Sequence, residues 1–382
     1  ESMWLSVDGS GYLHHNRAGM DGFSSPLDLD SVTAGEQKRL VSEITSLTYT
    51  DAGDNDAVRF TNGAFEFNDP AFSAISLSAR QVLMDSGTSI TTVDGNINFL
   101  ANVGGAANYE GIKIQGGAIT TTNGDIVLRG RGGDVGGNAD NTGVWLLGGA
   151  QVTSLGAGSI TIEGTGGEGN GDPAVVVSGV FVRNSEVTSL GTGTVSLDGT
   201  GGDGVEGVRG VDIVTNSSVR SVIGDIQITG QGGSGSGSFH TGVVVGDSSV
   251  VESTGTNKAD AATITINGTG GDVGTFGNLG VALDSVRSVA GDITITGQGG
   301  NATGGYNYGV DVGIVESTGT SKADAATITI NGTGGDGALH NYGVRVGGSG
   351  SRVSSEAGDI SITGLGDDSG RDNQGVLLQS GG

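Results

Sequence analysis

The chain contains no cysteine among its 382 residues. Disulfide bonds and thiolate metal sites are therefore excluded. Prolines number only 3 against 78 glycines, and no strict three-residue period accompanies the glycines, so a collagen helix is excluded as well. No apolar run approaches the roughly 20 residues that a helix needs to cross a bilayer, and we expect no membrane insertion by this segment.

Positive charge is also scarce, with 17 lysines and arginines against 42 acidic residues and a net charge of −25. This balance opposes nucleic acid and anionic membranes as partners. Corner carboxylates and glycine carbonyls offer oxygen ligands for calcium, although the tandem nonapeptides of calcium-binding β-rolls are missing, and plain turn chemistry is the alternative. No other cofactor is predicted. The chain opens without a signal-like segment and stops inside a repeat, so we expect a piece of a longer protein.

Residues 1–74 are rich in aromatic side chains and are not repetitive. Leu40, Val41, Ile44 and Leu47 recur at helical spacing, which predicts one short helix over residues 36–47. An Asn-Gly turn between two alternating runs predicts a hairpin over residues 57–67. An array of stacked strands needs cover at its end, so we interpret residues 1–74 as a capping segment.

Residues 75–382 carry a repeat of 29 to 38 residues, represented best by Gly-Asp-Ile-Thr-Ile-Thr-Gly at 291–297. Each unit holds three short alternating runs separated by glycines. No single run can bury its apolar face alone, so stacking of like units is expected. The sequence therefore predicts an all-β chain: a three-sided parallel β-helix of about nine coils, right-handed by the usual crossover rule.

Alignment of the third run in each unit predicts two columns of side chains. Buried hydroxyls that bond along the axis are expected from Ser154, Ser189, Ser221, Ser253, Ser288, Ser317 and Ser355. Beside them, alternating charges on the outer face are expected from Arg220, Glu252, Arg287 and Glu316. Opposite charges on adjacent strands stabilise a pair by about 0.2–1 kcal/mol and fix its register, so we assign both columns to structure.

The repeats resemble those of large bacterial surface proteins of the filamentous-haemagglutinin type, most clearly in the Gly-Asp-Ile-Thr-Ile-Thr-Gly motif and in Gly-Thr-Gly-Gly-Asp-Gly at 332–337. The resemblance covers about residues 75–382 and implies a secreted adhesin built as a long right-handed β-helix. It further implies an extracellular or cell-surface location, and a cell-surface glycan or other protein subunits as partners. Longer glycine-rich turns depart from that family, and no secretion domain is recognisable in residues 1–74.

A contact site is predicted on the outer column of the second run, where Trp145 stands above Phe181, flanked by Lys113 and Asp212. Cover by the corner loop at residues 166–177 is the alternative. We predict a non-enzymatic structural or adhesive role, with no catalytic residue. One alternative is a β-helical enzyme or binding protein for polysaccharides, for which the corner acids Asp272, Asp336, Asp367 and Asp368 are candidates although they read as turn residues. The other alternative is a subunit that polymerises end to end.

Overall fold

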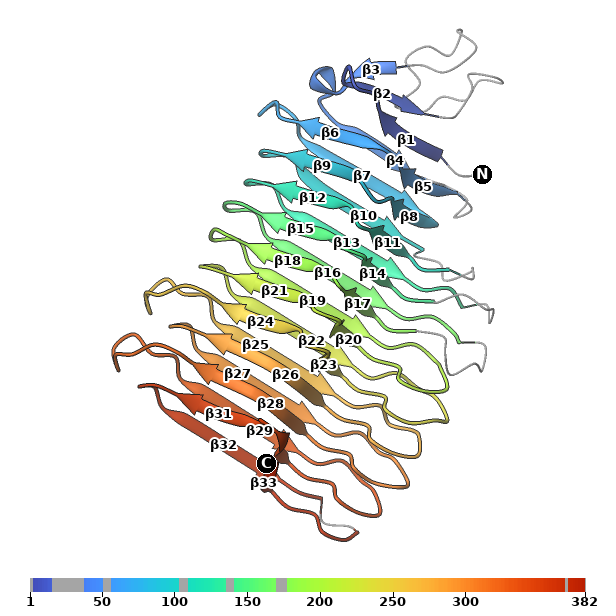
Figure 1. Ribbon diagram of the computed structural model, residues 1–382. Coiled ribbons are helices and arrows are strands. Elements are labelled where there is room, and N and C mark those ends of the chain that lie inside the picture. The colour runs from blue at the N-terminus through green and yellow to red at the C-terminus, as the bar shows by residue number, and fades with distance from the viewer. Residues whose placement is uncertain are drawn as a thin grey trace.

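The computed structural model describes residues 3–15, 38–50, 56–102, 109–134, 141–169, 177–367 and 370–381. In these ranges the chain forms an all-β solenoid of about 10 turns, which confirms the predicted stacking of parallel coils (Figure 1). Each coil contributes one strand to each of three ladders that run along the axis, and these correspond to the three runs of the repeat. The right-handed winding stays a prediction.

The first ladder is an 11-stranded parallel sheet in the described part of the chain. It comprises β4 (Leu47–Thr50), β7 (Ala74–Ala79), β10 (Asn96–Ala101), β13 (Ile126–Arg131), β16 (Ile160–Thr165), β19 (Val195–Thr200), β22 (Ile226–Gln231), β25 (Ile264–Thr269), β27 (Ile293–Gln298), β29 (Ile328–Thr333) and β32 (Ile360–Leu365). Ile160 pairs with Val195, and Val195 pairs with Ile226, so like side chains lie above one another in one wall.

The second and third ladders belong to one sheet, because β26 and β28 run through both. The second ladder comprises β5 (Ala57–Phe60), β8 (Gln81–Met84), β11 (Ile112–Gln115), β14 (Val144–Leu147), β17 (Val180–Arg183), β20 (Val211–Val214), β23 (Val243–Val245), β26 (Val281–Ser288), β28 (Val310–Ser317), β30 (Val344–Ser349) and β33 (Val376–Gly381). The third comprises β6 (Gly63–Phe67), β9 (Thr88–Thr92), β12 (Ala118–Thr121), β15 (Gln151–Ser154), β18 (Glu186–Ser189), β21 (Ser218–Ser221), β24 (Val250–Ser253), the second halves of β26 and β28, and β31 (Arg352–Ser355).

The core is a continuous column of aliphatic side chains between the ladders. Alternation along each strand turns every second residue inward, and Ile126, Ile160 and Val195 are fully buried. Each buried Val, Ile or Leu stabilises the fold by about 1.5–3 kcal/mol. The core therefore stabilises the stacking against the conformational entropy of a glycine-rich chain.

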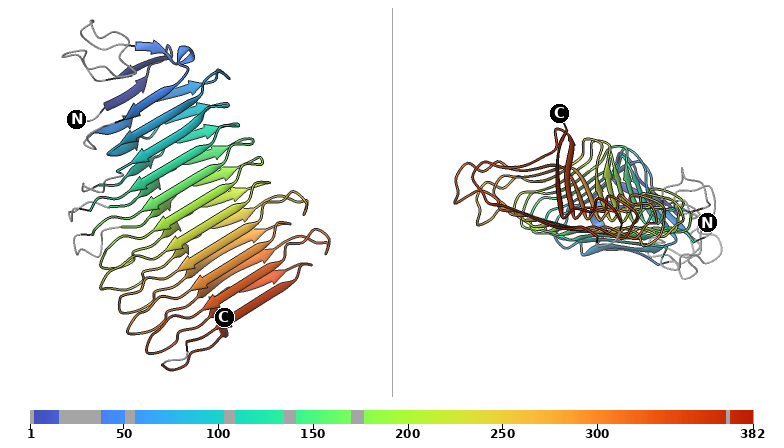
Figure 2. Two further views of the ribbon diagram at one scale, coloured as in Figure 1. Left: turned by 180° about the vertical axis from the view of Figure 1, so that it is seen from behind. Right: turned by 90° about the horizontal axis from the view of Figure 1, so that it is seen from below.

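A glycine ends the inward row of most first-ladder strands because the backbone of the second ladder lies against it. A Cβ added to Gly164 would lie 2.0 Å from the carbonyl oxygen of Gly179, and one added to Gly199 would lie 2.0 Å from that of Gly210. Beyond this close contact the chain projects sideways as a loop before it returns to the second ladder. Figure 2 shows these loops along one edge of the solenoid.

Buried asparagines hold successive loops together. Asn278, Asn307 and Asn341 occupy the same loop position and are fully buried. The Asn278 amide N–H donates to Oδ1 of Asn307 (3.0 Å), and the Asn307 amide donates to Oδ1 of Asn341 (3.2 Å). His240 takes this position one coil earlier, where its amide donates to Oδ1 of Asn278 (3.1 Å). The asparagine ladder, which we had not predicted, gives the loops a fixed register.

The amino-terminal segment covers the first coil through a small mixed sheet. β1 (Met3–Val7) pairs in parallel with β5, β2 (Tyr12–His15) pairs antiparallel with β1, and β3 (Lys38–Leu40) pairs antiparallel with β2. Phe60, Phe65 and Phe67 fill the core beneath this sheet. Among the described residues, the aromatic-rich part of the chain thus lies at the end of the array.

Three predictions for the first 74 residues are wrong. The described part of 36–47 is not an α-helix: β3 is followed by the 3₁₀ turn η1 (Val41–Glu43) and then by β4. The strands β5 and β6 form no hairpin, because they pair in parallel with β8 and β9 of the next coil, and Asn62 (φ 50°) makes a solenoid corner. The array therefore begins at Leu47 rather than at residue 75, which adds a coil to the nine predicted.

Candidate functional site

The serine column of the third ladder is buried as predicted, but its bonds run differently. Ser154, Ser189 and Ser221 are fully buried, and the column extends through Ser253, Ser288 and Ser317 to the half-buried Ser355. The Ser189 hydroxyl donates to the carbonyl of Gly193 (2.6 Å) in the turn that follows its own strand, and Ser154 bonds Gly158 (2.5 Å) in the same way. These hydroxyls thus close corners within a coil instead of linking coils.

The charged column beside it links coils. Arg220 pairs with Glu252 (3.1 Å), and Arg287 pairs with Glu316 (2.8 Å). Arg352 reaches the same Glu316 (2.7 Å). The alternating charges therefore lie in the predicted register and contact one another, as a structural assignment requires.

The aspartates of the Gly-Asp-Ile motif are also engaged between coils. Asp125 accepts the amide N–H of Ser159 (2.8 Å), and Asp225 accepts that of Thr263 (2.9 Å). Asp292 accepts a bond from Thr327 (2.6 Å) and forms an ion pair with Lys258. Although partial burial raises the pKa of Asp292, the bonds from Lys258 and Thr327 outweigh it and the pKa is lowered.

The corner acids considered for catalysis do not converge within the described residues. Asp272, Asp336 and Asp367 follow equivalent strands at successive or alternate coils, and Asp272 and Asp336 are exposed. Asn301 lies between the first two, with its amide 3.5 Å from Asp272 and its oxygen 3.4 Å from the amide of Asp336. Asp368 lies outside the described residues. These contacts fit turn chemistry.

The predicted contact column on the second ladder is assembled but covered. The Trp145 and Phe181 rings stack with centroids 5.6 Å apart, and the Lys113 ammonium lies 4.4 Å from the centre of the Trp145 ring. Trp145 is only 8% exposed and Phe181 6%. The expectation of an open aromatic face is therefore wrong. Most of the loop proposed to cover it, residues 170–176, lies outside the described residues.

Asp212, the fourth member of that column, is buried next to Phe181 and paired with Arg209 (2.7 Å). Burial raises the pKa of Asp212, and the Arg209 guanidinium opposes the shift. Glu110 holds Lys113 at the other end of the column (2.6 Å). With both charges compensated by neighbours, the column is a packed cluster rather than an accessible binding face.

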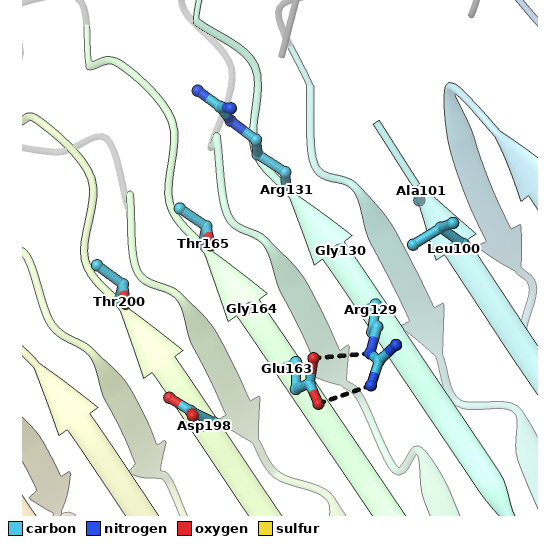
Figure 3. A pocket seen from close by; sticks show the side chains of 10 residues that line it. All are labelled: Leu100, Ala101, Arg129, Gly130, Arg131, Glu163, Gly164, Thr165, Asp198 and Thr200. Atoms are coloured by element: carbon cyan, nitrogen blue, oxygen red, sulfur yellow. Dashed lines mark hydrogen bonds and ion pairs between the residues drawn. The ribbon is translucent and has the colours of Figure 1, made fainter. Parts of the chain in front are cut away.

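A second outer surface, on the first ladder, holds a pocket of about 390 Å³. Figure 3 shows its charged side chains on three successive strands: Arg129 and Arg131 on β13, Glu163 on β16 and Asp198 on β19. Arg129 forms a bidentate ion pair with Glu163, with Nε 2.7 Å from Oε2 and Nη2 3.1 Å from Oε1. Leu100 lines one end, and Thr165 and Thr200 line the side toward the loops.

Asp198 differs from its neighbours because no ion pair is found for it in the described residues. Partial desolvation and the nearby charge of Glu163 raise its pKa. A carboxyl group with a raised pKa beside a clamped carboxylate is able to donate or accept a proton. We had missed this group. Aligning the third residue after the central isoleucine or valine of each first run would have placed Arg129, Glu163 and Asp198 in one outward column.

In the part of the chain that the structure describes, no three histidine or carboxylate side chains are grouped to hold a metal ion, and calcium stays a prediction. No helix among these residues has the length and apolarity needed to span a membrane. No protein-family model matches the chain, and no curated protein or solved structure matches it.

Proposed function

We propose that the chain is a non-enzymatic, structural and adhesive part of a large extracellular or cell-surface bacterial protein. The observation that carries this proposal is the use of recurring charged groups to join coils. The Arg220–Glu252 and Arg287–Glu316 pairs and the aspartates of the Gly-Asp-Ile motif all contact the next coil. Such contacts support a continuous rod that presents surface along its length.

The proposal is tested with the intact chain immobilised on beads, measuring attachment to bacterial and animal cells. We expect beads that carry the folded chain to attach more cells than beads that carry heat-denatured chain. Small-angle scattering should show that the chain has an elongated shape. Attachment to no cell type would overturn the adhesive function, and release of reducing ends from a polysaccharide would overturn the non-enzymatic part of the proposal.

A polysaccharide-processing enzyme is the second candidate, favoured by the pocket at Arg129, Glu163 and Asp198. Two carboxyl groups on neighbouring strands are the groups that glycoside cleavage requires. The clamp on Glu163 counts against it, since a bidentate guanidinium lowers the reactivity of a carboxylate as a base. Reducing-end release abolished by Asp198→Asn, but not by Asp272→Asn as a matched control, would support the enzyme.

End-to-end polymerisation is the third candidate, and the cap counts against it. β1 occupies the edge of β5, and β2 and β3 continue that small sheet. A second copy that stacked on this end would have to displace β1. Sedimentation that shows one monomeric species over a wide concentration range would remove this candidate.

A further inference from the structure

Four successive loops between the first and second ladders each carry one ring at the same edge of the solenoid. The rings belong to Phe239, Phe276, Tyr306 and His340, which we call the aromatic ridge. Phe239 is 54% exposed, Phe276 47% and Tyr306 43%, while His340 is half-buried. The loops that carry them lie at the right of Figure 1, between β22 and β30.

The ridge has a regular register because its backbone forms inter-coil bonds. The amide of Phe239 donates to the carbonyl of Phe276 (2.9 Å), and the amide of Tyr306 donates to that of Leu339 (3.0 Å). Phe276 also pairs with Gly305, and Gly305 with Leu339, in parallel bridges. Parallel-paired segments are about 4.8 Å apart, so the loops that carry the rings recur at about this interval.

Three residues of the aromatic ridge have a backbone conformation that residues with a side-chain ring rarely adopt. Phe239 (φ 65°), Tyr306 (φ 61°) and His340 (φ 55°) are left-handed. Glycine fits this conformation, and the loop of Phe276, the second of the four, has Gly277 (φ 68°) at the equivalent position. There the preceding residue, Phe276, supplies the ring instead. A strained residue persists only where the surroundings or a function require it.

Packing does not explain why these rings face solvent. The Phe239 ring packs against Gly277 and the Phe276 ring packs against Gly304, yet Phe239 and Phe276 remain 54% and 47% exposed. Tyr306 contacts the His340 ring with centroids 5.2 Å apart. Behind them, Tyr308 and Tyr342 stack at 5.1 Å and are only 8% exposed, which gives the ridge a firm support.

We infer that the aromatic ridge binds a neutral linear polysaccharide that lies parallel to the solenoid axis. Exposed aromatic rings stack on sugar rings, and the interval of about 4.8 Å between the loops that carry them suits successive sugars of an extended chain. The net charge of −25 repels acidic glycans and favours a neutral ligand over an acidic one. Next to the rings, the exposed Thr275 hydroxyl, which the buried Ser238 hydroxyl contacts (2.6 Å), offers a hydrogen bond to a sugar hydroxyl. This inference rests on the proposed adhesive function and names its ligand class.

The test is calorimetric titration of the intact chain with two neutral hexasaccharides, one of β-1,4-linked glucose and one of β-1,4-linked N-acetylglucosamine. We expect binding of at least one, weakened at least tenfold in Phe239→Gly/Tyr306→Gly. Because glycine suits the left-handed conformation, the melting temperature of this variant should be unchanged or higher, so weaker binding cannot come from unfolding. Phe276→Ala should weaken binding as well.

The matched control is Leu155→Ala/Leu190→Ala, which removes two apolar side chains exposed by 47% and 50% at a different corner. It should bind as the unmodified chain does. No binding of either hexasaccharide, or equal binding by the ridge variant, would overturn the inference. So would a ridge-dependent dimer in sedimentation, since the occupant would then be a second copy. If the ridge variant still attaches to cells, the inference fails while the adhesive function stands; if the unmodified chain attaches to none, the adhesive function fails.

Discussion

Replacing His240 by asparagine should stabilise the solenoid, because His240 interrupts the asparagine ladder of the loops. Its side chain is fully buried, and neither ring nitrogen forms a hydrogen bond of ordinary geometry. Burial lowers the pKa of His240 and outweighs the Gly235 backbone and the charges of Asp203 and Glu206, which favour the protonated form. The neighbouring Asn278 shows what the position prefers, since its amide group donates to the carbonyls of Gly271 (2.8 Å) and Val273 (2.6 Å).

The size of the gain follows from these contacts. An asparagine at 240 would restore one or two buried hydrogen bonds worth about 1 kcal/mol each, and it would remove two unpaired buried nitrogens that cost about 1–3 kcal/mol. Loss of the packing of the His240 ring against the loop glycines offsets about 1–2 kcal/mol of this gain. The net expectation is a gain of about 1–2 kcal/mol in the free energy of unfolding of these loops.

The same substitution should change how stability depends on pH. Because the pKa of His240 is lowered in the folded chain from its ordinary value of 6.5, the unfolded chain takes up the proton first as pH falls. The stability associated with the neutral imidazole is present above about pH 6.5 and is lost as pH falls through the lower folded pKa. His240→Asn should therefore lose less stability than the unmodified chain between pH 8 and 5.

Hydrogen exchange is the assay, because repeat arrays need not unfold in one step. Amides of residues 232–241 and 270–279 should exchange about five- to thirtyfold more slowly in His240→Asn. Amides of residues 112–115, which lie several coils away, serve as the control and should not change. Faster exchange near residue 240, or an unaltered pH dependence, would refute the assignment of His240 as an unsatisfied member of the ladder.

Three further predictions concern the contacts that hold the coils. Gly199→Ala should cost about 4 kcal/mol or more in unfolding free energy, because its Cβ would lie 2.0 Å from the Gly210 carbonyl, whereas Gly9→Ala meets nothing within 4 Å and is the control for thermal unfolding. Ser189→Ala should cost about 1 kcal/mol in denaturant titration, since a buried hydroxyl bond is lost. Because the pKa of Asp292 is lowered in the folded chain, the ionised carboxylate stabilises the fold above its ordinary pKa of 3.8, and this stability is lost as pH falls through the lower folded pKa. Asp292→Asn should therefore flatten the loss of melting temperature between about pH 5 and 3.

The three ladders could be predicted because strand alternation and repeat length are local properties. Every coil offers the same inward Ile or Val, so one correct alignment places all of them. The amino-terminal segment has no repeat to align. Leu40, Val41, Ile44 and Leu47 satisfy helical spacing, yet Val41, Ile44 and Leu47 are buried by a strand and a 3₁₀ turn instead. Tertiary pairing with the next coil overrode the local pattern.

Site residues were predictable to the extent that alignment fixes which way they point. Ser189 points inward as predicted, but the nearest acceptor for its hydroxyl is the corner carbonyl of its own coil, which alternation does not reveal. Trp145 points outward as predicted, and yet it is covered. Whether an outward residue is exposed depends on whether a loop covers it. The loop sequences have no period-2 pattern from which the path of the loops could be predicted.

The aromatic ridge marks the boundary of what sequence alone supports. Phe239, Tyr306 and His340 share a loop position, but glycines of variable number precede them, so their alignment depends on the inter-coil bonds. In the sequence of a loop rich in glycine and small polar residues, an aromatic residue at a left-handed position cannot be distinguished from an ordinary substitution. Only the combination of positive φ, solvent exposure and a neighbour at the same place in the next coil sets it apart. Since strain and exposed apolar surface both oppose folding, their recurrence over successive coils indicates a requirement outside folding, which the ligand proposed for the ridge would supply.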